Sequence, residues 1–555
     1  MPSSLPSALA SAADRVLPRI LTQVCRDPSH PAYGCFDRNW WHYKIRDFPS
    51  IILQQGGYAL WQAGEVDSPE LPRQALRDLG AASCNFWCKR ARLHGAFEEY
   101  YPWEQGYPPL AFSTLAVAKL VREGAADQSK VEQGLRLAAV QLLTRFESQA
   151  ANQQVAGLAA LAVLRSIQPD FVPTDAYGNI LARTLSLQTT EGWFEEYGGP
   201  DIGYLSVTID CLWDIMDVQP DEQVRASIIH ASRFISQITA EGRIHVGLHN
   251  ARNTDYLVPY GLIRTARELP AAWPEGAPTV EALFAGAADS GHFLHATDDR
   301  YLSHYIGHSV IRARNYLSGI SVIRHASSES EDTSPPSNLP TFRPSHHFPF
   351  SSHSISPATA DRPFGIIITP RKGGIISLQS GHESASDYGW IIDDGKRQHI
   401  THWWSDEWTW KEEAPDFITI TGHFYLHRET ESSPLKHMVL RAMSLLLGRT
   451  IIGRLKSRLI FRRPRSPYHF KRIIKITGQA VVISDTIAGL SDLSRLQRAS
   501  RPSKRHVASA DSFHRDDLDL LHGFTRDETV TTTDDTIRIE TVYGKTSKTA
   551  HKECE

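Results

Sequence analysis

Hydrophobic and polar positions recur with the spacing of an α-helix over the first half of the chain. From about residue 13 to about residue 285, apolar residues return every three or four positions, in runs that Pro- and Gly-containing loops separate. Strand-like alternation is nearly absent there. The pattern predicts helices over the ranges Phe48–Ala63, Leu71–Arg92, Leu110–Val121, Val131–Ser148, Asn152–Ile167, Ile180–Leu187, Leu205–Met216 and Val224–Ile238.

Successive helices of this length, joined by short loops, pack either as a solenoid or as a closed (α/α) toroid. Polar and aromatic residues gather at one end of alternate helices, which favours the toroid. We therefore expect an (α/α) toroid over residues 1–295.

The pattern changes near Tyr301. Short β-like runs follow, separated by turn residues, and they predict an antiparallel β-sandwich over residues 296–555. The segment 325–362 is rich in Ser, Pro, Thr and His and is predicted to be a mobile surface loop. The predicted strands are His308–Arg312, Phe364–Thr369, Gly374–Gln379, Trp390–Asp393, Phe417–Tyr425, Ile473–Ile483 and Thr536–Tyr543.

One segment, 436–475, is strongly basic. It holds twelve Lys and Arg and no Asp or Glu, interleaved with Leu, Ile and Phe. It is either a helix or hairpin that contacts a membrane surface or an anionic polymer, or a solvated face that balances the acidic N-terminal half. Nucleic acid is not expected as a partner, because no recognised binding module frames the segment.

Composition adds few constraints. A chain of 555 residues is too long for one core, which agrees with two large domains. The six Cys lack the spacing of a disulfide framework or of a complete zinc site, so no metal and no cofactor are expected, apart from a structural divalent metal that the β domain could hold. The N-terminus shows no signal peptide, which predicts a location in the cytoplasm or at the membrane periphery. The oligomeric state stays open.

The most informative feature is a repeated loop. Phe97-Glu98-Glu99-Tyr100 is followed five residues later by Gly106-Tyr107, and Phe194-Glu195-Glu196-Tyr197 is followed at the same spacing by Gly203-Tyr204. Both copies lead into a predicted helix. Glycines let a ligand approach the backbone, aromatic rings stack on sugars, and a Tyr at a helix start presents a hydroxyl. The alternative is that both loops are capping elements whose aromatics close the core.

Together with a toroid and a sandwich, this loop resembles that of the heparinase II/III-like polysaccharide lyases, which include related alginate lyases. The resemblance implies that an Asn or Gln neutralises the uronate carboxylate, that a Tyr acts as acid or base, and that a His completes the set. Glu191-Gly-Trp-Phe…Gly203-Tyr204 is similar to the Tyr loop of the family, and Asn152-Gln153-Gln154 to its Asn-bearing helix start. His382, in Ser380-Gly-His-Glu, resembles its Gly-His region.

These residues suit β-elimination. The C5 proton of a uronate is too weakly acidic to leave unless the carboxylate is neutralised, which Asn152 or Gln153 could do by donation and Arg252 by charge. Tyr204 could protonate the leaving oxygen, with His249 as a candidate neighbour. The expected function is a carbon–oxygen lyase that cleaves an acidic, uronate-containing polysaccharide. The expected substrate-binding residues are Trp103, Tyr107, Gln153, Trp193, Glu196, Tyr197 and Arg252.

Three alternatives remain open on the sequence. The same proton abstraction without loss of the leaving group would make the protein a uronate C5-epimerase. A glycoside hydrolase could use one carboxylate from each Glu pair, Glu98/Glu99 and Glu195/Glu196. A non-catalytic polysaccharide-binding protein of a surface-polysaccharide assembly system would use the aromatic loops for binding alone.

Overall fold

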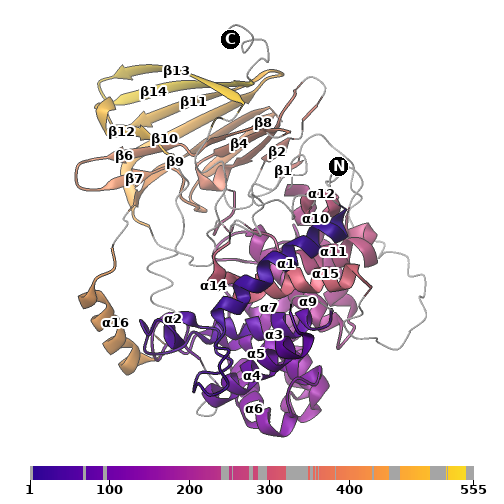
Figure 1. Cartoon of the computed structure of the whole chain (residues 1–555). Coiled ribbons are helices and arrows are strands. Elements are labelled where there is room, and N and C mark those ends of the chain that lie inside the picture. Colours follow the sequence, from indigo (N-terminus) through magenta and orange to yellow (C-terminus); the bar gives the residue numbers. More distant parts are fainter. Residues whose placement is uncertain are drawn as a thin grey trace, which may run out of the picture.

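The computed structural model describes residues 4–66, 71–91, 95, 97–238, 249–252, 254, 256–273, 279–284, 297–319, 348–349, 354–356, 358–359, 362–381, 383–414, 416–427, 431–448, 450, 463–500, 521 and 523–545. Helices form the N-terminal part and antiparallel strands form most of the C-terminal part (Figure 1). The predicted fold class, a helical toroid followed by a β-sandwich, is confirmed.

Six inner helices form a closed ring. Each packs against the next, and the last packs back on the first. The inner helices are α3 (Gln55–Ala63), α5 (Tyr107–Arg122), α7 (Ala151–Ile167), α9 (Ile202–Met216), α11 (Pro259–Glu268) and α15 (Gly307–Leu317). The outer helices are α1 (Leu5–Gln23), α4 (Arg73–Ala91), α6 (Gln128–Thr144), α8 (Thr174–Leu185), α10 (Glu222–Ile238) and α12 (Val280–Phe284).

The sequences of the inner and outer helices differ in the way that their positions require. Inner helices are covered on all sides, so α5, α7 and α9 are buried along almost their whole length. Small residues of α7 allow close packing: a side chain at Gly157 would collide with the hydroxyl of Tyr107 on α5. Outer helices such as α8 bury only one face.

The ring closes beyond residue 295, where the sequence predicted the toroid to end. Residues His308–Arg312, predicted to be a strand, belong to α15 instead. The reason is that α15 buries polar as well as apolar side chains: Arg312 is 1 % exposed and lies 2.6 Å from Asp214, which also pairs with Lys119 at 2.8 Å. These buried ions inside the ring hide the helical period of the sequence.

The C-terminal part is a sandwich of two antiparallel sheets. The smaller sheet has the order β1-β2-β3-β4-β5, and the larger has β12-β6-β7-β9-β10-β11-β14-β13, with β8 also paired to β9. Side chains of both sheets, such as Ile366 of β3 and Ile474 of β10, meet in one core. The strands of the smaller sheet are β1 (Phe348–Pro349), β2 (Ser354–Ser356), β3 (Gly365–Thr369), β4 (Ile375–Ser380) and β5 (Glu383–Asp387). Those of the larger sheet are β6 (Trp390–Asp393), β7 (Gln398–Ile400), β8 (Thr409–Ala414), β9 (Phe417–His427), β10 (Arg465–Ile476), β11 (Ala480–Ala488), β12 (Leu496–Arg498), β13 (Phe524–Thr533) and β14 (Thr536–Lys545).

Two details of the predicted β domain are wrong. Strands β1 and β2 lie within 325–362, so part of the predicted mobile loop is the edge of the smaller sheet, and most of the remainder falls outside the described residues. The predicted strand Ile473–Ile483 is the end of β10, a tight turn and the start of β11. The turn is closed by a hydrogen bond between Thr477 and Ala480. Because it is so short, it hardly interrupts the run of apolar residues in the sequence.

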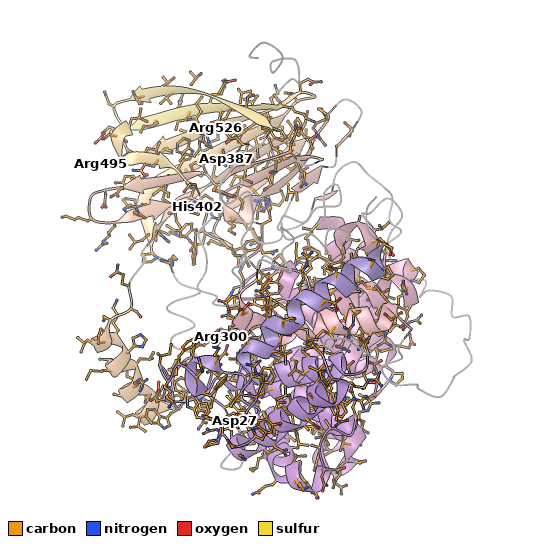
Figure 2. The ribbon with its side chains drawn as sticks, viewed as in Figure 1. Asp27, Arg300, Asp387, His402, Arg495 and Arg526 are labelled. Atoms are coloured by element: carbon orange, nitrogen blue, oxygen red, sulfur yellow. The ribbon has the colours of Figure 1, made fainter. Side chains whose placement is uncertain are left out.

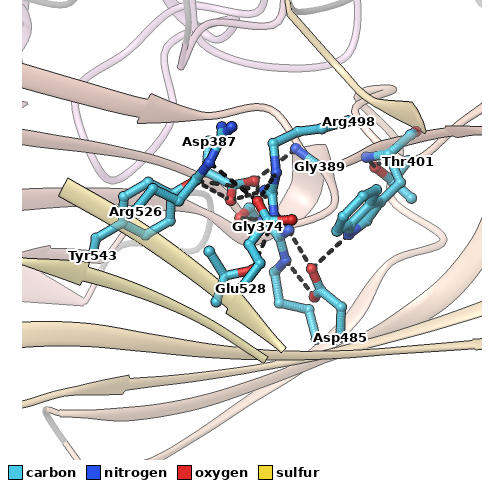
Figure 3. Close-up of polar contacts among 12 residues, drawn as sticks. Gly374, Asp387, Gly389, Thr401, Asp485, Arg498, Arg526, Glu528 and Tyr543 are labelled. Carbon is cyan, nitrogen blue, oxygen red and sulfur yellow. Dashed lines mark hydrogen bonds and ion pairs between the residues drawn. The ribbon is translucent and has the colours of Figure 1, made fainter. Parts of the chain in front are cut away.

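A buried ion network joins the two sheets (Figure 3). Arg472 of β10 has no exposed surface, and it pairs with Asp485 at 2.7 Å and with Asp387 at 3.1 Å. Tyr543 donates to Asp387 at 2.8 Å, and Arg498 pairs with it at 2.5 Å. Burial alone would raise the pKa of Asp387, but the two arginines hold it well below 3.8. The two arginines of the network therefore balance the charges of its two buried aspartates.

We expect Arg472→Ala to lower the free energy of unfolding of the sandwich by about 3–5 kcal/mol, because it leaves two buried carboxylates without their main cation. Arg495→Ala is the matched control: Arg495 pairs with Asp492 at 3.3 Å, but half of each side chain is exposed, so its loss should cost less than about 1 kcal/mol. Figure 2 shows Arg495 at the margin of the sandwich. Urea titrations followed by circular dichroism would measure both, and equal losses would contradict the role given to the network.

Candidate functional site

The repeated loops are a structural repeat. In each copy a backbone N–H at the start of an inner-helix segment donates to the carbonyl of the first Glu: Ile51 to Glu98 at 3.2 Å, and Ala151 to Glu195 at 3.0 Å. The following Gly and Tyr then begin α5 in one copy and α9 in the other. Both loops therefore lie at the same end of the ring. Contacts with Thr369 and Trp404 show that this end faces the sandwich.

The first turn of α9 holds Tyr204 in a fixed position. Asp201 caps the helix by accepting the N–H of Tyr204 at 2.9 Å, and it also accepts a short hydrogen bond from Thr254. A side chain at Gly203 would collide with Thr254 and with the backbone of Tyr256. Tyr204 is 6 % exposed. Thr254 and the backbone of Tyr256 therefore pack closely against the first turn of α9, and only Gly at position 203 allows this contact.

A second group joins the starts of α7 and α9. The N–H of Asn152 donates to Glu196 at 2.6 Å, and the amide of Gln153 donates to the hydroxyl of Tyr197 at 3.2 Å. The guanidinium of Arg252 lies 3.7 Å from the centre of the Tyr197 ring. Tyr197 has a φ of +56°, a strained backbone for a bulky residue. The structure thus brings together five of the residues that the sequence proposed.

Burial and charge act in opposite directions on the carboxyl group of this cluster. Burial raises the pKa of Glu196 well above 4.5, more than the N–H of Asn152 and the charge of Arg252 lower it. The shift favours the neutral form of Glu196, which lessens the repulsion that an anionic sugar would meet beside the guanidinium of Arg252.

Other tyrosines lie near Tyr204. The hydroxyls of Tyr256 and Tyr305 are 2.5 Å apart, and the charged form of Tyr204 would disfavour ionisation of both Tyr256 and Tyr100. Tyr256 is buried, whereas Tyr100 is 47 % exposed. This group of tyrosines therefore extends from the interior of the ring to the solvent.

His304 is a candidate that the sequence analysis missed. It lies in a π-helical turn, Leu302–Ile306, with non-helical φ and ψ, a feature that is frequent at functional sites. Its ring is 4.9 Å from that of Tyr301 and 5.9 Å from that of Tyr305. Its Nε2 is buried and has no hydrogen-bond partner among the described residues. Burial, together with the charge of Arg300, lowers the pKa of His304 well below 6.5, which favours the neutral ring and makes it a weaker base than a solvated imidazole. The aromatic residues on either side of it in the sequence were the available signal.

The sandwich contacts the Tyr204 loop directly. His249 is 1 % exposed, with Nδ1 2.6 Å from the hydroxyl of Thr369 and Nε2 2.8 Å from that of Ser377. Trp404 donates to the carbonyl of Gly198 at 2.8 Å, and its ring covers Gly199. The space beside these glycines, which looked free for a ligand, is filled by Trp404. His249, proposed as a catalytic neighbour of Tyr204, has both ring nitrogens in contacts with the sandwich.

The remaining candidates lie apart from one another. Tyr107 is buried between α5 and α7 and donates to Gln154 at 3.0 Å, which favours a packing role. Trp103 is 44 % exposed and has a φ of +60°, so its face is available to a sugar. Trp193 donates to Glu191 at 2.8 Å, next to Gly192, which packs on α10. His382 falls outside the described residues.

His402 is a second histidine that the sequence analysis missed. It lies on the side of the sandwich that faces the ring, between Thr401 and the pair Trp403-Trp404 (Figure 2). Burial, together with the charge of Lys372, lowers the pKa of His402 to about 3. Lys372 also donates to the carbonyl of Asn250 at 3.1 Å, so His402 is close to the contact between the domains. Among the described residues, no group of three His, Cys, Asp or Glu side chains is placed to hold a metal ion.

Comparisons with known proteins were made for sequence and structure. No family model and no curated protein matches the sequence. The structure is similar to chondroitin AC lyase of Streptomyces coelicolor A3 in complex with chondroitin sulphate, at 9 % identity and a TM-score of 0.46, over 97 % of this chain and 77 % of that chain. It is similar to heparinase III at 10 % identity and a TM-score of 0.42, over 97 % and 83 % of the two chains. For a xanthan lyase of Paenibacillus the values are 11 %, 0.42, 97 % and 56 %.

These structures are polysaccharide lyases. They belong to the kind of enzyme that the resemblance of the sequence implied.

The upstream loop yields a pH-dependent prediction. Burial and the neighbouring Glu104 raise the pKa of Glu99 from 4.5 to about 7. The folded protein therefore holds a proton that the unfolded chain releases, and stability is lost as the pH rises through about 7. Glu99→Gln removes the ionisation, so we expect its stability relative to the parent protein to increase between pH ~5 and pH ~8, by at most about 3 kcal/mol.

Thermal unfolding across this pH range would measure the effect. Glu222→Gln, at a carboxylate that is 85 % exposed on α10, is the control and should follow the profile of the parent protein. A constant difference between Glu99→Gln and the parent protein at all pH values would show that Glu99 is ionised in the folded state.

Proposed function

We propose that this protein is a carbon–oxygen lyase that cleaves an acidic, uronate-containing polysaccharide by β-elimination. The observation that supports the proposal is the grouping of an amide, a guanidinium and a tyrosine at one end of the ring. Asn152 and Tyr204 stand on the first turns of neighbouring inner helices, and Arg252 stacks beside them on Tyr197. Glu196 connects Asn152 to this group by accepting its backbone N–H, and burial favours the neutral form of its carboxyl group.

Each part has a role in the elimination. Asn152 and Arg252 oppose the charge that develops on the carboxylate when the C5 proton leaves. The electrons of the C5–H bond form the C4–C5 double bond, the C4–O4 bond breaks, and O4 takes a proton. Tyr204 supplies this proton, for which a tyrosine needs no shift of its pKa. The neutral His304, in the same tyrosine-rich end, is the candidate that accepts the C5 proton.

The structure gives little support to hydrolysis by the repeated Glu pairs. A hydrolase needs one ionised and one protonated carboxyl group on either side of the glycosidic bond. Burial raises the pKa of Glu196 well above 4.5 and that of Glu99 to about 7. Glu196 also accepts the N–H of Asn152, and Glu99 is 3 % exposed. Neither is a ready carboxylate nucleophile.

We expect Tyr204→Phe to lower the turnover number by about 100-fold or more, because the change removes only the hydroxyl that transfers a proton. The assay is the ultraviolet absorbance of unsaturated products from a panel of uronate polymers. Counts of reducing ends and uptake of solvent deuterium at C5 would distinguish a hydrolase and an epimerase. Thermal unfolding of the variant should change little.

Tyr107→Phe is the matched control, since Tyr107 holds the same place in the upstream copy of the loop. Its hydroxyl donates to Gln154 inside the helix packing, so the variant should lose about 1 kcal/mol of stability and little activity. Full activity of Tyr204→Phe, or loss of activity only through unfolding, would show that Tyr204 does not transfer a proton in the reaction.

A further inference from the structure

The helix α16 (Pro434–Leu447) presents its apolar side chains to solvent. Only Ser444 is buried among its fourteen residues. The large apolar side chains with a substantial exposed fraction are Leu435 at 69 %, Met438 at 66 %, Val439 at 51 %, Met443 at 41 %, Leu445 at 61 %, Leu446 at 82 % and Leu447 at 39 %. A soluble monomer rarely exposes so many adjacent apolar residues without a partner for them.

The polar stripe of this helix faces the protein. His437, Arg441 and Ser444 are four and three residues apart and therefore share one side of the helix. Ser444 is the buried residue, and Arg441 makes two hydrogen bonds to Asp47, at 2.7 and 3.0 Å. Figure 1 shows α16 outside the ring and the sandwich, beside α2 (Arg38–Trp41). The orientation is the reverse of that of a core helix, because the apolar stripe points outward.

The sequence of the helix and its flanks is basic, which favours an anionic partner. No Asp or Glu occurs from residue 432 to residue 484, and twelve Lys and Arg lie within 436–475, of which Lys436 and Arg441 are on α16 and Arg472 is buried in the sandwich. An anionic polysaccharide would satisfy the charge but would leave the apolar side chains in water, and a second copy of the helix would bring two basic surfaces together. A lipid surface with anionic headgroups satisfies both. Fourteen residues span about 21 Å, less than the ~30 Å of a hydrocarbon core, so the helix would lie in the interface.

We propose that α16 is a docking helix for an anionic membrane surface. Lys436 flanks the apolar stripe and can extend to the headgroups while Val439 and Leu446 enter the acyl boundary. Among the described residues no helix is long and apolar enough to cross a membrane. Arg441 and Asp47 link the helix to the helical part of the protein at the same time.

The test is co-sedimentation of the full chain with vesicles of phosphatidylcholine alone or with added phosphatidylglycerol. Binding should require the anionic lipid and fall as salt is raised. Val439→Glu should weaken the partition coefficient by roughly tenfold. The matched control is Val140→Glu: Val140 is also 51 % exposed, but it lies on the outer helix α6, and its change should leave binding as it is.

Three results would overturn the proposal. Equal binding by Val439→Glu and the parent protein would remove α16 from the interaction. The protein could fail to bind either vesicle and still be retained on an anionic polymer, with equal retention of Val439→Glu. That result would show that the basic segment binds a polymer and not a membrane. A dimer in light scattering that Val439→Glu dissociates, without any vesicle binding, would make a second copy the partner.

Discussion

The contact between the ring and the sandwich determines what the candidate site can be. His249 places its two ring nitrogens against hydroxyls of Thr369 and Ser377, deep inside the protein. Asn250, Ala251 and Thr254, which follow it, form hydrogen bonds with the loop that leads to Tyr204. The same buried polar contact that joins the domains therefore also fixes the start of α9. Burying these polar groups is tolerable only because each one has a partner on the other side.

The two copies of the loop share a backbone arrangement but place their tyrosines in different surroundings. In the upstream copy the hydroxyl of Tyr107 is bonded to Gln154, and the Tyr closes the packing of two helices. In the downstream copy Tyr204 lies near Tyr256 and Tyr100. The repeat supplies the position of a tyrosine at the start of an inner helix, and the neighbours of the hydroxyl differ between the two copies.

Much of this arrangement could be predicted from the sequence, because it depends on local patterns. Helical periodicity located the inner helices α5, α7 and α9 to within a few residues, but it missed α11 and α15; the repeated loops identified one end of the ring. Residues at helix starts of one ring end meet in space, and the structure places Asn152, Gln153, Glu196, Tyr197 and Arg252, all named from the sequence, in contact with one another. That they bind substrate stays a prediction.

Other features depend on partners that are distant in the sequence. His249 meets residues 120 and 128 positions away, and no local pattern records such a contact. The strand predicted at His308–Arg312 failed because Arg312 is paired inside the ring, which no single segment reveals. His304 escaped notice because a π-helical turn has no sequence period of its own.

The packing of the two domains depends on the lack of a Cβ atom at Gly199. A Cβ at this position would lie 2.3 Å from the ring of Trp404, so the sandwich can settle on the ring only where the side chain is a hydrogen. Even the methyl group of an alanine would force Trp404, or the sandwich that carries it, away from the loop. The position of Trp404 against the loop that precedes Tyr204 is thus set at a residue that has no side chain of its own.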